Sequence, residues 1–317
     1  MTDTASDRLK RIRYYITWCL ITIGMVSVIK APGFCGRYVM KGLEICVKAV
    51  IPSVFPAAIL GSLLSRAQPP RFLAKPVSRI FGMSEDCACA VTAGMFSGFP
   101  TGALCTVGLL KSGRISRDDA ERLICFVSSP SAAFVAGSVG AYMLHSIRAG
   151  IALVLIQLFT NFAIGVYLGR RRDRSYECAR SVGVKSLSAR DFTDSVKDAA
   201  LAMLNVSAFV TAFSVVCGFA LEFIKNPYIS ALICGALELG NGVSALSSLD
   251  LSVGTRFLIA GIFVGWSGIS AQMQVLAVCA DSGISMKKYF LSRVVSCVIT
   301  GCICALLLRF TSGSFIA

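Results

Sequence analysis

The sequence predicts an all-α polytopic membrane protein, an inverted repeat with two re-entrant helical hairpins and two interrupted transmembrane helices. Three observations support this prediction. The 317 residues are 55% hydrophobic and only 15% charged, with a mean hydropathy of +0.73, whereas soluble proteins hold about 25% charged residues. Basic residues gather between the apolar runs, and motifs that break helices recur in the same order in both halves.

The first apolar run, residues 15–31, follows a basic cluster at 8–13. Because no small-x-small cleavage pattern follows closely, we interpret the run as an uncleaved span rather than a signal peptide. The basic cluster places the N-terminus in the cytoplasm. Further spans are expected over residues 43–65, 118–144 and 149–169, because a helix needs about 20 apolar residues to cross the bilayer.

The segment 86–111 contains the stretch MFSGFPTGAL, which places two Gly and a Pro inside an apolar run. If this segment crossed the membrane, the tract 170–197, with eight Lys and Arg, would lie outside, against the positive-inside rule. Its arms, 86–98 and 101–111, reach roughly 20 and 17 Å at about 1.5 Å per residue, far enough only for the bilayer centre. The segment is therefore predicted to be a re-entrant hairpin.

The second half repeats this order, with a span at 196–222, a hairpin at 228–249 with ELGNG at its tip, and spans at 255–280 and 288–309. Each half has three crossings, an odd number, so the second half is predicted to be inverted relative to the first. The predicted organisation has four parts: an N-terminal cytoplasmic segment with the first span (1–42), a first repeat (43–169), a basic cytoplasmic linker (170–195) and a second repeat (196–310).

The helix breaks predict one central binding site, because irregular backbone is tolerated in hydrocarbon only where it is buried or lines a polar cavity. The N-termini of half-helices carry partial positive charge and free N–H groups that favour an anionic substrate, whereas exposed carbonyls and carboxylates favour cations. The candidate substrate-binding residues are Ser97, Phe99, Pro100 and Thr101 in the first hairpin, Ser128, Ser129, Pro130 and Ser131 in the interrupted span, and Asn241, Trp266, Ser267, Gln272 and Gln274 in the second half.

Glu238 is the one acidic residue deep in an apolar segment. An intramembrane carboxylate is costly without a partner, so we assign it ion coupling, as a proton carrier or a cation ligand. The alternative is a protonated structural Glu. For the first hairpin tip the alternative is a Pro-kinked helix that packs against its neighbours through the small-residue face of Gly94, Gly98 and Gly102. Gln157 and Asn161 are interpreted as polar contacts between helices.

Other classes of protein are disfavoured. The net charge of +14 follows from the positive-inside rule, so no nucleic-acid partner is expected. The chain has a single His and no CxxC among its 14 Cys, so we expect no metal, no cofactor and no disulfide framework. No HExxH, P-loop or GxSxG motif is present, and an enzyme is not expected. Ser116 is predicted to cap a helix that begins with Asp118 and Asp119.

Five motifs resemble a known family: SGFPTGA (97–103), ISRDDAERL (115–123), SSPSAAFVAGSVG (128–140), LELGNG (237–242) and WSGISAQMQV (266–275). In this order they resemble the sporulation integral membrane proteins of the YlbJ/SpoVV type. These proteins contain nucleoside-recognition Gate domains and are distantly similar to concentrative nucleoside transporters. The chain departs from them at Leu104, where relatives often have Lys, and at Ser128 and Ser129, where they often have Asn.

The resemblance implies a multi-pass protein of the outer forespore membrane that moves a small anionic metabolite, with dipicolinic acid first, during sporulation. Alternatives are a nucleoside-type or other cation-coupled solute carrier, or a non-transporting scaffold of the spore envelope. The expected partners are the anionic substrate and the lipid bilayer. Homo-oligomerisation and coupling to protons or sodium ions are left open by the sequence.

Overall fold

The computed structural model describes residues 5–170 and 187–311, and within these ranges every regular element is a helix. Six helical segments are long and apolar enough to cross a membrane, at 11–30, 32–66, 147–170, 189–223, 253–282 and 287–311. The all-α polytopic fold is thereby confirmed. Most of the basic linker at 170–195 lies outside the described residues.

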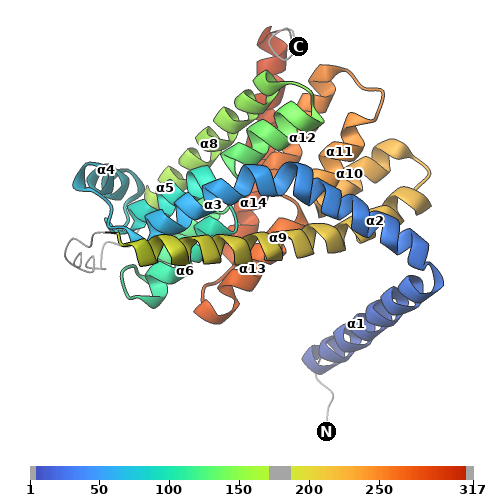
Figure 1. The fold of residues 1–317 in the computed structure, drawn as a ribbon, viewed down its shortest axis with the longest axis horizontal. Coiled ribbons are helices and arrows are strands. Elements are labelled where there is room, and N and C mark those ends of the chain that lie inside the picture. Colours follow the sequence, from blue (N-terminus) through green and yellow to red (C-terminus); the bar gives the residue numbers. More distant parts are fainter. Residues whose placement is uncertain (1–4, 171–186, 312–317) are drawn as a thin grey trace.

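Two long helical segments pack antiparallel through the middle of the molecule (Figure 1). One is formed by α2 (Pro32–Ile45), the short π-helical η1 (Cys46–Val50) and α3 (Ile51–Arg66), and the other is α9 (Ala189–Phe223). At one end of the pair Tyr38 packs on Gly218, and at the other Arg66 forms an ion pair with Asp198. Each segment has 35 residues, about 52 Å at 1.5 Å per residue, which exceeds the ~30 Å of a bilayer core.

The first hairpin consists of α5 (Cys87–Ser97) and α6 (Thr101–Lys111). Its arms approach closely because Gly94 faces Gly102 without an intervening side chain, and a Cβ on Gly102 would lie 3.1 Å from the Cα of Gly94. Gly94 and Gly102 therefore allow the two arms to pack closely, which is the packing role that the sequence analysis gave as an alternative. The preceding α4 (Arg71–Phe81) was not predicted from the sequence, and it packs on α5 and α8.

An interrupted helix follows the first hairpin. Its first part, α7 (Arg117–Val127), is capped as predicted, because Ser116 Oγ accepts a hydrogen bond from the Asp119 amide at 3.0 Å. The chain then leaves the helix at residues 128–131 and resumes with one short helical step into the π-helical η2 (Phe134–Met143). The continuous α8 (Ile147–Arg170) completes the first half.

The second half has the same order of elements. After α9 come a hairpin of α10 (Pro227–Leu237) and α11 (Leu239–Ser247), an interrupted helix of α12 (Val253–Trp266) and α13 (Ile269–Cys279), and the continuous α14 (Lys287–Thr311). Gly242 meets Gly235 across the arms of this second hairpin. Both hairpins thus use a glycine pair to bring their arms together.

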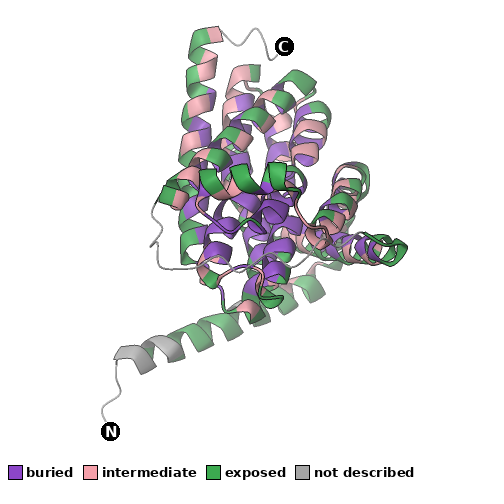
Figure 2. Cartoon of the chain, turned by 90° about the vertical axis from the view of Figure 1, so that its left-hand side faces the viewer, coloured by how far each residue is buried: buried purple, intermediate pink, exposed green. Residues whose placement is uncertain are grey.

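The hairpins enter the molecule from opposite ends of α9. Arg114, at the base of the first hairpin, lines one pocket with Asp198 near the start of α9, whereas the second hairpin begins at Pro227, just after α9 ends. Figure 1 accordingly shows α5 and α6 on the left and α10 and α11 on the right. Buried residues concentrate where the helices meet, whereas α1 (Ala5–Lys30) extends from the bundle with exposed sides (Figure 2).

Candidate functional site

The first hairpin tip docks on the break of the first interrupted helix. The amide of Phe99 donates a hydrogen bond to the carbonyl of Ser129 at 2.8 Å. Gly98 at this tip has a φ of +64°, and a Cβ there would collide with the backbone of Ser129 and Ser131. Only glycine fits such an approach without strain. The tip is fixed to α3 as well, because Ser97 Oγ donates to the Ala57 carbonyl at 2.6 Å.

Two amides of α8 hold this break in place. Gln157 Nε2 donates to Ser129 Oγ at 3.0 Å and to the Pro130 carbonyl at 2.5 Å, and Asn161 Nδ2 donates to Ser129 Oγ at 2.8 Å. All of these groups are buried. Because Pro130 cannot donate a backbone hydrogen bond, side chains satisfy groups that a continuous helix would pair internally. The two amides are therefore polar contacts between helices, as the sequence indicates.

The second hairpin tip is organised by Glu238. Its Oε1 accepts from the Gly240 amide at 3.0 Å, and its Oε2 accepts from the Asn241 amide at 2.6 Å and from Asn241 Nδ2 at 2.8 Å. Asn241 Nδ2 also donates to Ser214 Oγ of α9 at 2.7 Å. Glu238 is thus the N-cap of α11, where a carboxylate is favoured by the free amides and the helix dipole.

The second break carries its own set of hydrogen bonds. Trp266 Nε1 donates to the Ala236 carbonyl of α10 at 2.8 Å, and Gln272 Nε2 donates to the Trp266 carbonyl at 3.0 Å. Gly268, with a φ of +79°, lies against the backbone of Glu238 and Leu239. Each hairpin tip therefore docks on the interrupted helix of its own half.

The two tips and the two breaks meet around one small central cavity. Its walls include Phe99 of the first tip, Ser131 of the first break, Glu238 of the second tip and Ser267 of the second break, with Ser270 and Gln274 of α13 beside them. Its volume is about 30 Å³, room for roughly two water molecules at 10–15 Å³ each. The breaks that are distant in sequence are thus neighbours in space.

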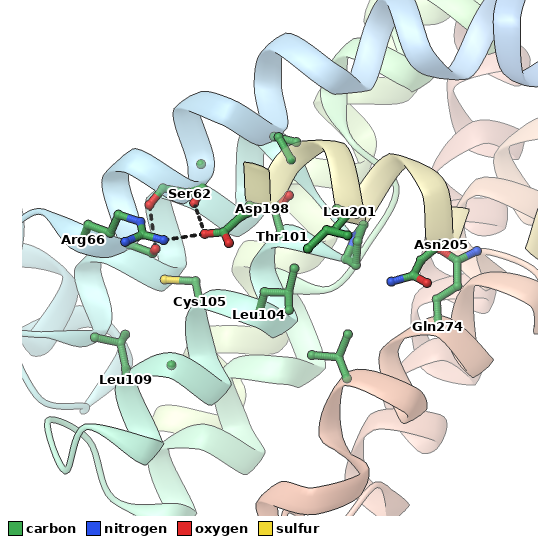
Figure 3. Close-up of a pocket in the computed structure, with 18 of the residues that line it drawn as sticks. Ser62, Arg66, Thr101, Leu104, Cys105, Leu109, Asp198, Leu201, Asn205 and Gln274 are labelled. Carbon is green, nitrogen blue, oxygen red and sulfur yellow. Dashed lines mark hydrogen bonds and ion pairs between the residues drawn. The ribbon is translucent and has the colours of Figure 1, made fainter. Parts of the chain in front are cut away.

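A larger vestibule leads from this centre toward one end of the molecule, between α3, α6, α9 and α13 (Figure 3). Its volume is about 660 Å³, within the range of roughly 300–1,000 Å³ found for ligand pockets. Gln274 lines both the vestibule and the central cavity. The walls are largely apolar, with Leu104, Leu201 and Phe209, while Thr101, Asn205 and Gln274 supply polar groups at the inner end.

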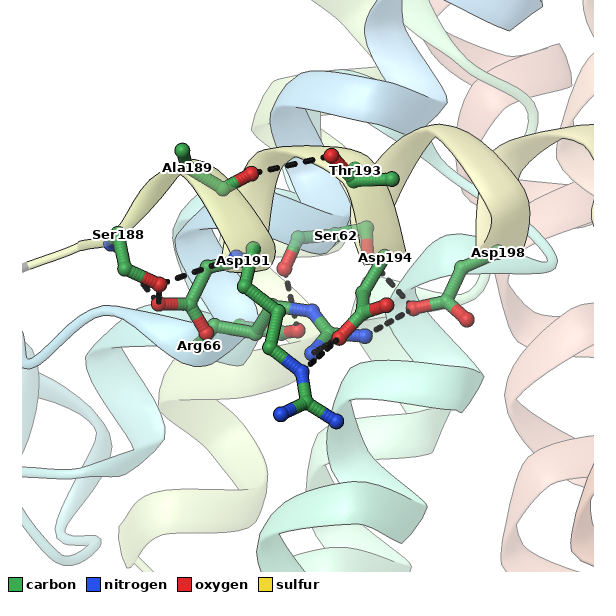
Figure 4. A network of polar contacts seen from close by, with 10 residues as sticks. Ser62, Arg66, Ser188, Ala189, Asp191, Thr193, Asp194 and Asp198 are labelled. Carbon is green, nitrogen blue, oxygen red and sulfur yellow. Dashed lines mark hydrogen bonds and ion pairs between the residues drawn. The ribbon is translucent and has the colours of Figure 1, made fainter.

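Ion pairs surround the mouth of the vestibule. Arg66 Nη2 lies 2.6 Å from Asp198 Oδ2, which also accepts from Ser62 Oγ at 3.0 Å (Figure 4). Across the mouth, Arg114 Nη2 lies 2.6 Å from Asp86 Oδ1. Burial lowers the pKa of Arg114, but the hydrogen bond from Arg114 to Asp86 and the negative charge of Asp86 have the larger combined effect. The pKa of Arg114 is therefore raised above its ordinary value. The guanidinium therefore stays charged.

The four half-helices that begin at the centre differ in how they are capped. On the side of the second hairpin, Glu238 caps α11 and Ser131 Oγ accepts from the Phe134 amide of η2 at 3.0 Å. On the vestibule side, no side chain caps α6 or α13. Near α13 the buried Ser270 Oγ and Gln274 Oε1 have no partner among the described residues. These two uncapped N-termini are suited to an anion.

The predicted substrate-binding residues separate into three groups. Phe99, Ser131 and Ser267 line the central cavity, together with the predicted ion-coupling residue Glu238. Pro100 and Thr101 line the vestibule, and Gln274 lines both the vestibule and the central cavity. Six others form hydrogen bonds that hold the tips and breaks in place around this centre, namely Ser97, Ser129, Pro130, Asn241, Trp266 and Gln272. Ser128 is buried in the first break.

Sequence reasoning missed the role of Arg293, which lies in α14. The residue is fully buried, and its Nη2 donates to the Cys125 carbonyl at 2.5 Å, a group that also accepts from Ser292 Oγ at 3.0 Å. This carbonyl is free because α7 ends at Val127, and a cation complements a helix C-terminus. The one available signal is the position of Arg293 six residues into an apolar span.

Comparison with known proteins gives one informative relative. The "Sporulation integral membrane protein YlbJ" of Bacillus subtilis (strain 168) is 25% identical over 299 residues, an alignment covering 80% of this chain and 72% of that protein. The chain is therefore similar to YlbJ over most of both sequences. No family model matches the sequence, and no solved structure matches it. The likeness to this integral membrane protein and the six apolar helices together support a multi-pass membrane protein.

Proposed function

We propose that this protein is a secondary transporter or facilitator for a small anionic metabolite during sporulation, with dipicolinic acid across the outer forespore membrane as the first candidate. The observation that carries the proposal is the meeting of two hairpin tips and two helix breaks around one cavity beside a 660 Å³ vestibule. Interrupted helices that meet in this way characterise the substrate sites of secondary transporters. The kinship with a sporulation protein supports the biological setting.

The hairpins would enter the bilayer from opposite faces, so that the second half is inverted relative to the first. The entry of the hairpins from opposite ends of α9 supports this arrangement. The end with Arg66, Arg114 and the linker would be cytoplasmic, because it is rich in Lys and Arg. The vestibule would then admit substrate from the cytoplasm, while the second hairpin and η2 close the opposite side.

The preference for an anion rests on the uncapped N-termini of α6 and α13. The charge of Glu238 does not oppose it strongly, because three donors at the start of α11 already engage that carboxylate. An aromatic ring would lie between Leu104, Leu201 and Phe209, and its carboxylate would reach Thr101, Asn205 and Gln274. Pockets of this kind combine apolar walls with a few placed polar groups.

The test is uptake of labelled dipicolinate into proteoliposomes that contain the purified full chain. We expect uptake well above empty vesicles, and a strong reduction in Gln274→Leu, which removes the amide that lines both cavities. Val278→Leu, on the same helix and lining only the vestibule, is the matched control and should transport nearly normally. No uptake of dipicolinate, of other small carboxylates or of nucleosides by folded protein would contradict the transporter proposal.

A competition panel separates the alternatives. Inhibition by picolinate and other aromatic acids is expected, with little inhibition by neutral nucleosides. The opposite ranking would indicate a nucleoside-type carrier. A scaffold of the spore envelope would instead tolerate polar changes at both hairpin tips and show no uptake at all.

A further inference from the structure

The helix α4 presents three different faces around its axis. At 3.6 residues per turn, each residue advances by about 100°. Ala74 and Phe81, which are buried, fall within about 20° of each other on one face. Arg71, Lys75 and Arg79 fall within about 80° on a second face, and Phe72, Leu73, Pro76 and Ile80 fall within about 100° on a third.

The first face anchors α4 to the bundle. The ring of Phe81 stacks on Phe126 of α7 at a centroid distance of 5.1 Å and meets Phe162 of α8 edge-on at 5.6 Å. Ala74 is 1% exposed. With this face fixed, the other two faces must point away from the protein.

The two outward faces carry opposite chemistry. Phe72 is 75% exposed, Ile80 45% and Leu73 40%. Arg71, Lys75 and Arg79 are exposed, and none forms an ion pair with a described residue. An exposed apolar face beside an unpaired basic face is typical of a helix that lies in the plane of a membrane interface.

We propose that α4 lies in the headgroup layer and binds anionic phospholipid through Arg71, Lys75 and Arg79. Phe72, Leu73 and Ile80 enter the boundary of the acyl chains. The apolar face selects a lipid over a free phosphate, because a soluble anion leaves those side chains in water. Since α4 connects α3 to the first hairpin, it also fixes the bilayer surface at the base of that hairpin. This inference does not depend on transport.

The test compares lipid retention by the purified full chain in native mass spectrometry, with phosphatidylglycerol and phosphatidylcholine of identical acyl chains. The triple variant Arg71→Gln, Lys75→Gln, Arg79→Gln should lose its preference for phosphatidylglycerol, by about fivefold for each charge removed. The matched control is the triple variant Lys111→Gln, Lys197→Gln, Lys287→Gln, which removes three other exposed charges and should retain most of the preference. An equal loss in both variants, or no loss in the α4 variant, overturns the proposal.

A second measurement addresses the apolar face. Phe72→Trp adds an indole whose fluorescence, measured against the wild-type background, should be quenched by lipids brominated on their acyl chains and shielded from aqueous iodide. An indole that iodide quenches and brominated lipid does not would place α4 in water and overturn the proposal. The thermal unfolding midpoint of each variant shows that it is folded.

Discussion

Phe99 and Ser129 are joined by a backbone hydrogen bond of 2.8 Å, which couples the tip of one hairpin to the break of a helix 30 residues later in the chain. Both residues lie where a helix is interrupted, so the Phe99 amide and the Ser129 carbonyl have no partner within a helix. The bond between them pairs both groups in an apolar environment. An unpaired group of this kind costs several kcal/mol in lipid. The tip and the break thus stabilise one another, and the central cavity lies where they meet.

We first predict that Gly98→Ala destabilises the protein and abolishes transport. A Cβ at this position would collide with the backbone of Ser129 and Ser131, and a non-glycine residue at this positive φ is itself strained. The expected loss is roughly 1–3 kcal/mol or more, measured by thermal unfolding in detergent. Gly108→Ala is the control, because a Cβ there meets nothing within 4 Å. Similar unfolding midpoints for both variants would contradict the docking.

Glu238 can act as a helix cap or as a coupling carboxylate, and two substitutions separate these roles. Glu238→Asp keeps a carboxylate but shortens it, and Glu238→Gln keeps the length but loses the charge. If capping is the whole role, Glu238→Gln should lower stability by about 1 kcal/mol and leave the dependence of uptake on proton and sodium gradients unchanged. Uptake that loses its response to an imposed gradient only in Glu238→Gln would instead assign ion coupling.

The ion pair of Arg66 and Asp198 at the vestibule mouth should matter more for transport than for stability. Its side chains are 29% and 47% exposed, and such pairs contribute about 0–1 kcal/mol. We expect Arg66→Gln to raise the KM for an anionic substrate severalfold, with an unfolding midpoint close to that of the wild type. A charge swap of Arg66 and Asp198 serves as the control. An unchanged KM in Arg66→Gln would show that substrate does not pass this mouth.

The pair of Arg114 and Asp86 should stabilise the protein equally across neutral pH. Asp86 raises the pKa of Arg114 in the folded protein. The contribution of the pair to the free energy of unfolding is therefore fully present below the ordinary pKa of arginine, and it is lost only as pH rises through the pKa of Arg114 in the folded protein. Arg114→Gln leaves the buried Asp86 without its cation and should cost roughly 2–4 kcal/mol. The difference in unfolding midpoint from the wild type should stay constant between about pH 6 and 9. A difference that grows or shrinks over this range would contradict the assignment.

Topology can be tested directly with reporter fusions at Gly113 and Gly183. Both should report the cytoplasm, because the first hairpin returns to the side from which it enters. Reporters that place both positions on the outer side would show that residues 86–111 cross the bilayer. The inverted arrangement of the halves would then be wrong.

Much of the helical framework could be predicted from local sequence. The runs around 149–169 and 288–309 are predominantly apolar, so their helices, α8 and α14, appear within two residues of the predicted ends. The cap at Ser116 was also readable, because Ser followed by acidic residues at the next turn satisfies free amides locally. By contrast, α4 was not predicted. Its three basic residues lower the mean hydropathy of every window that covers it, and its apolar residues are recognised only by their helical spacing.

The sequence by itself determined that the chain is a helical membrane protein with paired breaks, because apolar length, charge placement and residues such as Pro130 and Gly98 act on their own neighbourhood. Only the tertiary structure decided which polar groups face a cavity and which hold the backbone. Ser129 and Ser131 are two residues apart in one motif, yet one accepts hydrogen bonds from α8 and the other lines the centre. That difference arises from contacts between helices distant in the chain, and no local pattern encodes them.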